Sequence, residues 1–364
     1  MNYHFIFTYV PFAFALVAWG LYVRAARYRV RGQALALIAV LLAAAKFLAF
    51  AAFGGDAFKP HLPAAVIWGW NWIYSSVFVL LALSFVGLVA RRICCRRGDG
   101  RLARLVLPLG ALALAGWGCL NGLIAPRVRT LELVYDDLPP ALDGYRIVQL
   151  SDLHVSSAAG EWRTREVVAL ANALEPDCIC VTGDIVDGGV GELAHAVRPL
   201  AGLKAADGVW AVTGNHEYYN PWPQWRALLE QGGMRFLENR SVRLRDALVL
   251  GGANERFPDP ARAFAASGRE AFRVLMQHRP SRARANAAAH GVRLQLSGHT
   301  HGGIMPLADR LIARFNGGFV HGLYPLAAAA RSYLVVSRGT GQWAGFPVRF
   351  FNPSEINLII LRRP

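Results

Sequence analysis

The sequence predicts an α/β domain preceded by an all-α membrane region. Four apolar stretches of about membrane-spanning length fill the first part of the 364 residues. Beyond residue 129, short apolar runs alternate with segments of helical periodicity, as is typical of an α/β domain. Besides the runs discussed below, strands are expected at residues 130–135, 333–338 and 355–361, and helices at 162–174, 191–200 and 222–231. A loop followed by a helix is expected within residues 258–273. Several of these runs end in an Asp, Asn or His, which indicates chemistry at one edge of a sheet. We therefore expect two domains, residues 1–128 and residues 129–364.

The composition favours a membrane protein over a nucleic-acid-binding one. Hydrophobic residues make up 54% of the chain and charged residues only 17%, which is unusual for a soluble protein. The net charge of +15 comes mostly from arginine, because Lys46, Lys59 and Lys204 are the only lysines. No basic stripe interleaved with aromatic residues is present, so no nucleic-acid partner is expected. The five cysteines do not form a disulfide framework.

The four apolar stretches are predicted to be transmembrane helices that anchor the chain. They cover residues 6–23, 34–53, 66–90 and 105–125. The first lacks a basic n-region and a small-residue cleavage site, so an anchor is favoured over a cleaved signal peptide. Lys46 interrupts the second stretch, and we expect it to snorkel or to face the interior of the bundle. A transport role is disfavoured, because the stretches contain no acidic residue and we expect no broken helix.

The charges of the loops predict the orientation of this anchor. The arginines of the first and third loops are Arg24, Arg27, Arg29, Arg31, Arg91, Arg92, Arg96, Arg97, Arg101 and Arg104. The second loop has only Lys59 as a basic residue besides His61. The positive-inside rule places the first and third loops in the cytoplasm, and it outweighs Arg127 and Arg129 after the last stretch. The domain after residue 129 is then extracytoplasmic, on what we expect to be a bacterial inner membrane.

One stretch of that domain carries the first candidate site residues. The apolar run at residues 146–150 reads as a buried strand, and Asp152 and His154 follow it directly. With one residue between them, both side chains point to the same side of an extended backbone. A carboxylate and an imidazole on one face can hold a single metal ion. A helix cap beside a surface histidine is the more common explanation of so short a motif taken alone.

The same construction recurs along the chain. Four further strand-like runs lead to Asp184, to Asn215 and His216, to His278, and to His299 and His301. Five runs that each deliver an Asp, Asn or His at the same end favour a shared site over coincidence.

The residues collected in this way have the chemistry of a metal centre. The candidate ligands are Asp152, His154, Asp184, Asn215, His278, His299 and His301. A mixed oxygen and imidazole set without thiolate suits Mn²⁺, Fe²⁺ or Zn²⁺ better than a structural zinc site. Seven ligands are too many for one such ion with an open position. They suit two divalent ions about 3.5–4 Å apart, bridged by one carboxylate.

In this order, the motifs closely resemble those of the calcineurin-like metallophosphoesterases. Within that family the chain is similar to the membrane-anchored bacterial branch described as YkuE- or YaeI-like phosphodiesterases. The run at residues 297–303, the segment at 322–324 and the segment at 336–339 add to this similarity. The resemblance covers about residues 131–361. It implies a β-sandwich flanked by helices, with four layers in the order αββα.

The resemblance also implies a division of the ligands between the two ions. Asp152, His154 and His301 would hold the first ion, Asp184 would bridge, and Asn215, His278 and His299 would complete the second.

Further roles follow from the same resemblance. His216 would contact the phosphate and protonate the leaving oxygen, a general-acid role that suits an imidazole. Glu217 would either orient His216 or be solvated. Arg279, His321 and Arg338 lie near the expected site loops and are candidates for contacting the substrate.

We therefore expect a membrane-anchored phosphoesterase that uses two divalent ions and metal-activated water outside the cytoplasm. A phosphodiester is the favoured bond. Because an anchor concentrates the domain at lipid, membrane lipid is an expected partner and a lipid-linked phosphate a candidate substrate. The alternative is a catalytically inactive membrane scaffold or sensor with the same fold, but such a protein is expected to lose ligands, and none is missing. Monoester or diester, the native metal and the oligomeric state stay open.

Overall fold

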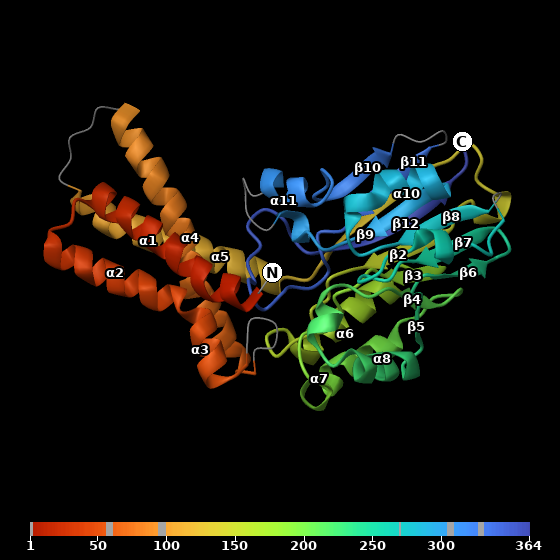
Figure 1. Cartoon of the computed structure of the whole chain (residues 1–364), viewed down its shortest axis with the longest axis horizontal. Coiled ribbons are helices and arrows are strands. Elements are labelled where there is room, and N and C mark those ends of the chain that lie inside the picture. Colours follow the sequence, from red (N-terminus) through yellow and green to blue (C-terminus); the bar gives the residue numbers. More distant parts are fainter. Residues whose placement is uncertain (1–2, 56–60, 94–99, 269–270, 304–308, 327–330) are drawn as a thin grey trace. The chain divides into compact units, whose positions relative to one another are not determined.

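The computed structural model describes residues 3–55, 61–93, 100–268, 271–303, 309–326 and 331–364. The chain divides into two compact units. Unit 1 combines Met1–Leu123 with Ala344–Val348, and unit 2 combines Ile124–Trp343 with Arg349–Pro364. Figure 1 shows the helices of unit 1 and the two sheets of unit 2.

The described part of unit 1 is built from five helices. They are α1 (Tyr3–Ala26), α2 (Val30–Ala44), α3 (Lys46–Phe53), α4 (Ala64–Ile93) and α5 (Arg101–Leu123). Within the described residues, α1, α4 and α5 are long and apolar enough to cross a membrane. If the bent pair α2–α3 is counted as one further span, there are up to four spans. The expectation of an unbroken second helix is wrong. A bend of 51° separates α2 from α3, because Ala45 leaves the helical conformation at ψ 7°.

Lys46, the first residue of α3, faces the interior of unit 1. Its side chain is fully buried, and its ammonium group donates to Asn71 Oδ1 at 2.7 Å and to the carbonyl of Gly345. The rings of Phe47 and Tyr74 lie 4.0 and 4.2 Å from the same nitrogen. Carbonyl dipoles and aromatic faces thus replace the hydration that the buried cation has lost. Of the two expected arrangements, snorkelling and facing the interior, the structure has the second.

Among its described residues, unit 2 contains two sheets of six strands each. The first has the order β1 (Arg127–Val134), β12 (Glu355–Arg362), β2 (Arg146–Leu150), β3 (Cys178–Val181), β4 (Val209–Ala211) and β5 (Met234–Phe236). The second has the order β10 (Gly322–Leu326), β11 (Ser332–Val336), β9 (Val292–Ser297), β8 (Phe272–Met276), β7 (Leu248–Gly252) and β6 (Arg240–Leu244). Strands β2 to β5 are parallel to one another, so their carboxyl ends share one edge.

Helices cover the outer face of each sheet. The helices α6 (Gly160–Asn172), α7 (Val190–Val197) and α8 (Trp222–Gln231) pack on the first sheet, and α10 (Ala283–His290) packs on the second. The alternation of strand side chains explains the layers, because Val148 joins the core under the helices while its neighbour Ile147 joins the core between the sheets. The expected four-layer αββα sandwich is confirmed (Figure 1).

Several local expectations need correction. The helix expected at 222–231 is present as α8, but the expected helix within 258–273 is only α9 (Pro260–Ala263), and β8 already begins at Phe272. The strands β5, β6, β7 and β10 were not expected. The five runs that lead to site residues are divided between the sheets: β2, β3 and β4 belong to the first, β8 and β9 to the second. The site therefore lies across the sandwich and not at the edge of one open sheet.

The core between the sheets should dominate the stability of unit 2. Ile147 is 1% exposed there, so Ile147→Ala leaves a cavity and is expected to lower the free energy of unfolding by about 2–5 kcal/mol. Val128→Ala is the matched control, because Val128 is 41% exposed on β1 and its truncation should cost less than about 0.5 kcal/mol. Thermal unfolding of the full chain in detergent, followed by tryptophan fluorescence, measures both. Equal midpoints for the two variants would contradict this account of the core.

Candidate metal centre

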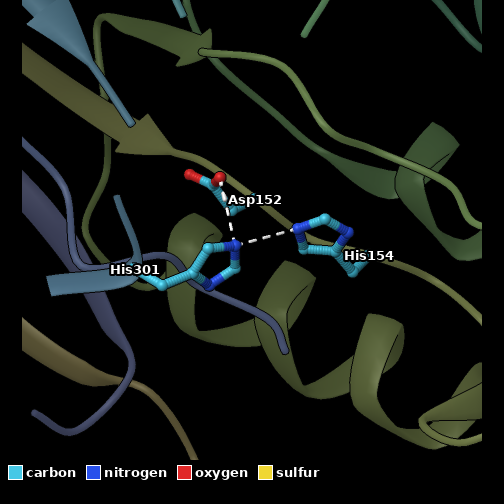
Figure 2. Close-up of side chains that lie close together, drawn as sticks. All are labelled: Asp152, His154 and His301. Carbon is cyan, nitrogen blue, oxygen red and sulfur yellow. Dashed lines mark hydrogen bonds and ion pairs between the residues drawn. The ribbon is translucent and has the colours of Figure 1, made fainter. Parts of the chain in front are cut away.

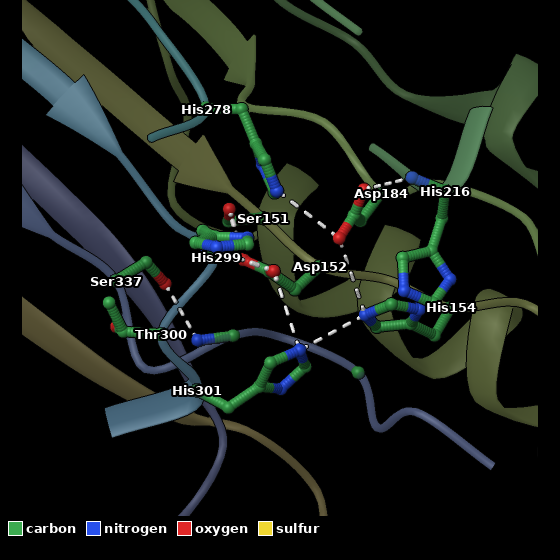
Figure 3. Close-up of polar contacts among 12 residues, drawn as sticks. Ser151, Asp152, His154, Asp184, His216, His278, His299, Thr300, His301 and Ser337 are labelled. Carbon is green, nitrogen blue, oxygen red and sulfur yellow. Dashed lines mark hydrogen bonds and ion pairs between the residues drawn. The ribbon is translucent and has the colours of Figure 1, made fainter. Parts of the chain in front are cut away.

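The candidate site residues gather where loops from both sheets meet. Asp152 and His154 follow β2, Asp184 follows β3, and His216 begins the short 3₁₀ helix η3 (His216–Tyr219) after β4. From the second sheet, His278 follows β8, and the loop after β9 carries the remaining two histidines. Figure 3 shows these side chains turned toward one another, although they come from segments almost 150 residues apart in the sequence.

Their ligand atoms form three overlapping groups. The groups are Asp152, His154 and His301; His154, Asp184 and His216; and Asp184, His278 and His299. Within each group the ligand atoms lie within 4.8 Å of one another, as a metal ion requires. His154 and Asp184 each belong to two groups, so the three form one continuous cluster. Six of the seven residues predicted as ligands are therefore brought together, and His216 joins them.

The first group contains two imidazole nitrogens that point at each other. His154 Nε2 and His301 Nε2 are 3.0 Å apart, and Asp152 Oδ1 lies 3.4 Å from the latter (Figure 2). His154 Nδ1 is 2.9 Å from a carboxylate of Asp187, which fixes its proton on that nitrogen and leaves the Nε2 lone pair facing the group. Two lone pairs at this separation repel each other unless a proton or a cation lies between them. This donor set fits a divalent ion.

His278 has the same arrangement in the third group. Its Nδ1 donates to the carbonyl of Thr182 at 2.7 Å, because a carbonyl oxygen can only accept. Its Nε2 is buried, lies 3.2 Å from Asp184 Oδ2, and has no hydrogen-bond partner among the described residues. A histidine fixed through one nitrogen and pointing the other at a carboxylate is the usual arrangement of a metal ligand. His278 and Asp184 thus fit a second ion.

The charges of the cluster also suit cations. Burial acts to lower the pKa of His278, but the carboxylates, led by Asp184, outweigh it and raise the pKa to about 10. Burial acts in the same direction on His216, yet Asp187 and Asp184 raise its pKa to about 9. Burial acts to raise the pKa of Asp184, but the surrounding imidazoles, His278 first, hold it well below its usual value. The carboxylates thus make the cluster attract positive charge.

The two histidines of the loop after β9 are kept neutral. Burial, reinforced by His278 and Arg279, places the pKa of His299 well below its usual value. Burial, reinforced by His154 and Arg349, does the same for the pKa of His301. A neutral imidazole is the form that binds a metal ion, since the ligand nitrogen must be free of its proton.

Backbone conformation marks the same residues. Five candidate ligands have positive φ angles: Asp152 (52°), His154 (44°), Asp184 (53°), His299 (74°) and His301 (49°). This left-handed region costs a residue with a side chain of order 1–3 kcal/mol, and such residues concentrate at functional sites. Hydrogen bonds between the loops hold the strained positions, such as Asp152 N to the carbonyl of Gly183 at 3.0 Å.

Asp187 holds two imidazoles of the cluster in place, although no motif in the sequence indicated it. Its Oδ2 lies 2.9 Å from His154 Nδ1 and its Oδ1 lies 2.6 Å from His216 Nδ1, so one buried carboxylate orients two imidazoles. Burial acts to raise the pKa of Asp187, but the two histidines outweigh it and keep the carboxylate ionised. The signal that could have found Asp187 is its position three residues after Asp184, on the same loop.

Glu217 has a third role, different from both that were expected. It is 3% exposed, so it is not solvated, and the hydrogen bonds of its carboxylate go to the backbone. Its Oε2 accepts from Gly214 N at 2.6 Å and from Asp184 N at 2.9 Å, and its Oε1 accepts from Ile185 N at 2.7 Å. Glu217 therefore ties the loop after β4 to the loop after β3.

The substrate-contact candidates separate into two kinds. Arg279 lies at the cluster, where it donates to Asn215 Oδ1 at 3.2 Å and to His299 Nε2 at 3.1 Å. These contacts also place Asn215 beside the third group. Arg338 Nε lies 3.8 Å from a carboxylate oxygen of Glu355, and His321 is near Arg338. Neither Arg338 nor His321 is part of the three groups.

Two more residues reach the site from the segment before β12, and no spacing in the sequence indicated them. Arg349 is 2% exposed, and its Nη2 lies 3.3 Å from His301 Nδ1 while donating to the carbonyl of Gly341 at 2.7 Å. The ring of Trp343 meets the ring of His216 edge to face, with 5.9 Å between the centroids.

Comparison with known proteins identifies a family whose match covers the segment that carries these site residues. Residues 145–303 match the calcineurin-like phosphoesterase family. An uncharacterized metallophosphoesterase of Helicobacter pylori (strain ATCC 700392 / 26695) is 31% identical over 297 residues, which cover 78% of each chain. The transmembrane protein with metallophosphoesterase domain of Danio rerio is 33% identical over 285 residues, covering 73% of this chain and 64% of that one. The uncharacterized metallophosphoesterase YkuE of Bacillus subtilis (strain 168) is 30% identical over 278 residues, 70% of this chain and 93% of that one.

The chain therefore belongs to the calcineurin-like metallophosphoesterase family, as its motifs indicated. Its fold is the mixed α/β sandwich described above, and its Asp and His side chains are positioned to bind a metal centre. Among solved structures, a 5'-nucleotidase precursor from Thermus thermophilus matches 59% of this chain and 54% of its own, with 14% identity and a TM-score of 0.38. That likeness is too distant to bear on function.

Removing the charge of Asp187 should weaken metal binding. Asp187→Asn keeps the size of the side chain but removes the carboxylate that orients His154 and His216. We expect metal affinity to fall about 10–100-fold, the usual cost of losing such a partner. Titration of the metal-free full chain with Mn²⁺ measures it. Asp137→Asn is the control, since Asp137 is 58% exposed and pairs with Arg293. An unchanged affinity in Asp187→Asn would contradict the role given to this carboxylate.

The close approach of backbone to ligand at Gly298 gives a second prediction. A Cβ atom there would overlap the side chains of Ser151 and Asp152, so Gly298→Ala must push the Asp152 carboxylate out of its place. We expect this variant to bind less than its full complement of metal, measured by elemental analysis after dialysis. Gly268→Ala should bind as the wild type does, because nothing lies within 4 Å of a Cβ at that position. Full metal content in both variants would count against the placement of Asp152.

Proposed function

We propose that the chain is a membrane-anchored phosphoesterase that hydrolyses phosphate esters, phosphodiesters foremost, at a centre of two divalent ions. The observation that supports it best is the continuous cluster of carboxylate and imidazole ligand atoms, since its overlapping groups match the expectation of two ions with a shared carboxylate. Two bound ions would polarise a phosphoryl group and make water a stronger nucleophile at neutral pH. Mn²⁺, Fe²⁺ and Zn²⁺ all suit the donor set.

The proposed division of ligands is the one that the family resemblance implies. Asp152, His154 and His301 would hold one ion, Asp184 would bridge, and Asn215, His278 and His299 would hold the other. The contact between His154 and Asp184, with 3.8 Å between Nε2 and Oδ2, is compatible with a bridging role for this carboxylate.

His216 is the proposed general acid. Its Nδ1 is held by Asp187 at 2.6 Å, so Nε2 is the atom that would deliver a proton to the leaving oxygen. Burial acts to lower its pKa, but Asp187 and Asp184 raise it to about 9, which favours the protonated imidazole that a general acid needs. Arg279 would neutralise a phosphate oxygen, because its guanidinium group already lies between Asn215 and His299. Arg338 and His321 are proposed as more distant substrate contacts.

The domain organisation and location are part of the proposal. Residues 1–128 would be the anchor of four spans and residues 129–364 the catalytic domain. The arginines of the first and third loops support an extracytoplasmic catalytic domain on a bacterial inner membrane. A lipid-linked phosphate is the proposed substrate class, because the anchor keeps the site near the bilayer.

The decisive experiment is metal-dependent hydrolysis by the full chain. The whole chain is used because Ala344–Val348 belongs to unit 1, so truncation would remove its packing partners. Protein stripped of metal and resupplied with Mn²⁺ should cleave bis-p-nitrophenyl phosphate faster than p-nitrophenyl phosphate. Asn215→Ala should lose activity together with metal. His195→Ala, at an exposed position on α7, is the control and should keep both.

His216→Ala separates acid catalysis from metal binding. General acids contribute about 10²–10⁴-fold, and the loss should be larger for an alkyl leaving group than for p-nitrophenolate, which needs little protonation. The same loss for both leaving groups would contradict the general-acid role. Two bound metals without turnover of any ester would instead favour the inactive scaffold or sensor.

A further inference from the structure

The edge of unit 2 that carries the candidate metal centre is also the edge at which the chain enters this unit. The apolar helix α5 ends at Leu123, and β1 begins at Arg127. Arg127 pairs with Glu355 at the start of β12, and two residues further along, Asn357 pairs with Gln149 near the end of β2. The loop that carries Asp152 and His154 begins directly after β2. Four Cα–Cα steps span at most about 14 Å, so this edge is tethered closely to the end of the last apolar helix.

Helix α11 (Asp309–Phe315) lies at the same edge. It packs against η5 (His301–Gly303), whose Gly302 carbonyl accepts a hydrogen bond from the Asn352 side chain. Two residues beyond Asn352, the Ser354 carbonyl accepts from Arg127 N at 2.8 Å. Within unit 2, Figure 1 shows α11 at the end opposite the C-terminus. The metal-site loop and α11 therefore lie beside the entry point of the chain.

The surface of α11 is unusual for a helix of a soluble domain. None of its residues is buried, although Leu311 and Phe315 are 61% and 75% exposed and lie one turn apart on one face. Arg310 and Arg314 form a second pair one turn apart on the adjoining face. Neither arginine has an acidic partner among the described residues. An apolar face flanked by basic side chains is the pattern of a helix that lies in the interface of a membrane.

We propose that α11 is a membrane-contacting helix whose partner is an anionic phospholipid surface. Leu311 and Phe315 would enter the boundary between headgroups and acyl chains, and Arg310 and Arg314 would bind the phosphates of the headgroups. The short connection from α5 to β1 keeps this edge within reach of a bilayer crossed by that helix. The inference rests on the proposed membrane anchor. It deepens the proposed function, because a metal centre facing the headgroups would take phosphate esters that reside in the membrane.

Photo-crosslinking in the full chain tests the contact between α11 and the lipid surface without requiring enzymatic turnover. The photoreactive residue p-benzoylphenylalanine replaces Phe315 in one variant and Phe257 in another. Phe257 is the matched control, since it is 77% exposed on the same unit but lies between β7 and α9. Both proteins are reconstituted into vesicles of phosphatidylglycerol and phosphatidylcholine, irradiated, and examined by mass spectrometry for lipid adducts.

A lipid adduct at position 315 and none at 257 is the expected result. Adding Arg314→Ala to the first variant should lower its adduct yield about fivefold in the mixed vesicles, and pure phosphatidylcholine should remove this difference. Lipid adducts at neither position, equal adducts at both, or a protein adduct at 315 would overturn the proposal. Hydrolysis of soluble bis-p-nitrophenyl phosphate is measured on the same samples. This hydrolysis should stay unchanged. Metal-loaded wild-type protein that hydrolyses neither this ester nor any other would refute the proposed function without affecting the crosslinking result.

Discussion

The concentration of buried carboxylates among imidazoles is the constraint on which the rest of unit 2 depends. Asp184 lies at its centre, 3.2 Å from His278 Nε2 and 3.8 Å from His154 Nε2, and it accepts a hydrogen bond from the backbone N–H of His216. Burying such a carboxylate is costly unless positive charge or donors surround it. The sandwich meets this condition by bringing loops from both sheets to one place, and the resulting field attracts cations.

Holding these groups in place requires a rigid and strained frame. The ligand residues occupy left-handed backbone conformations, and Glu217 fixes two of their loops through backbone N–H groups. Asp187 orients two imidazoles from behind, and Arg349 closes the site at His301. The large hydrophobic cores on both faces of the first sheet stabilise the unit and offset the free-energy cost of these strained conformations. The geometry of the metal centre thus depends on the packing of the whole unit and not on the ligands alone.

Much of this organisation could be predicted from the sequence, and the failures have physical causes. The strand-to-ligand pattern predicted which residues gather, because an apolar run followed at once by Asp or His restricts where the side chain can lie. The edge strands β6 and β10 could not be predicted, since their side chains show no clear alternation of buried and exposed positions. The break before Lys46 was missed because hydropathy alone does not distinguish a continuous helix from two helices that bend around a buried cation.

The sequence by itself determined the family, the mixed α/β class, the apolar anchor segments and the identity of the candidate ligands, because each depends on local pattern or on motifs in a fixed order. Only the tertiary structure decided which atoms face one another. The supporting roles of Asp187, Glu217 and Arg349 come from contacts between loops. Arg349 contacts His301, for example, although the two residues are 48 positions apart in the sequence. The position of α11 beside the entry of the chain also depends on strand pairing, which places β1, β12 and β2 side by side. Such contacts are set by the packing of the two sheets, and no local pattern encodes them.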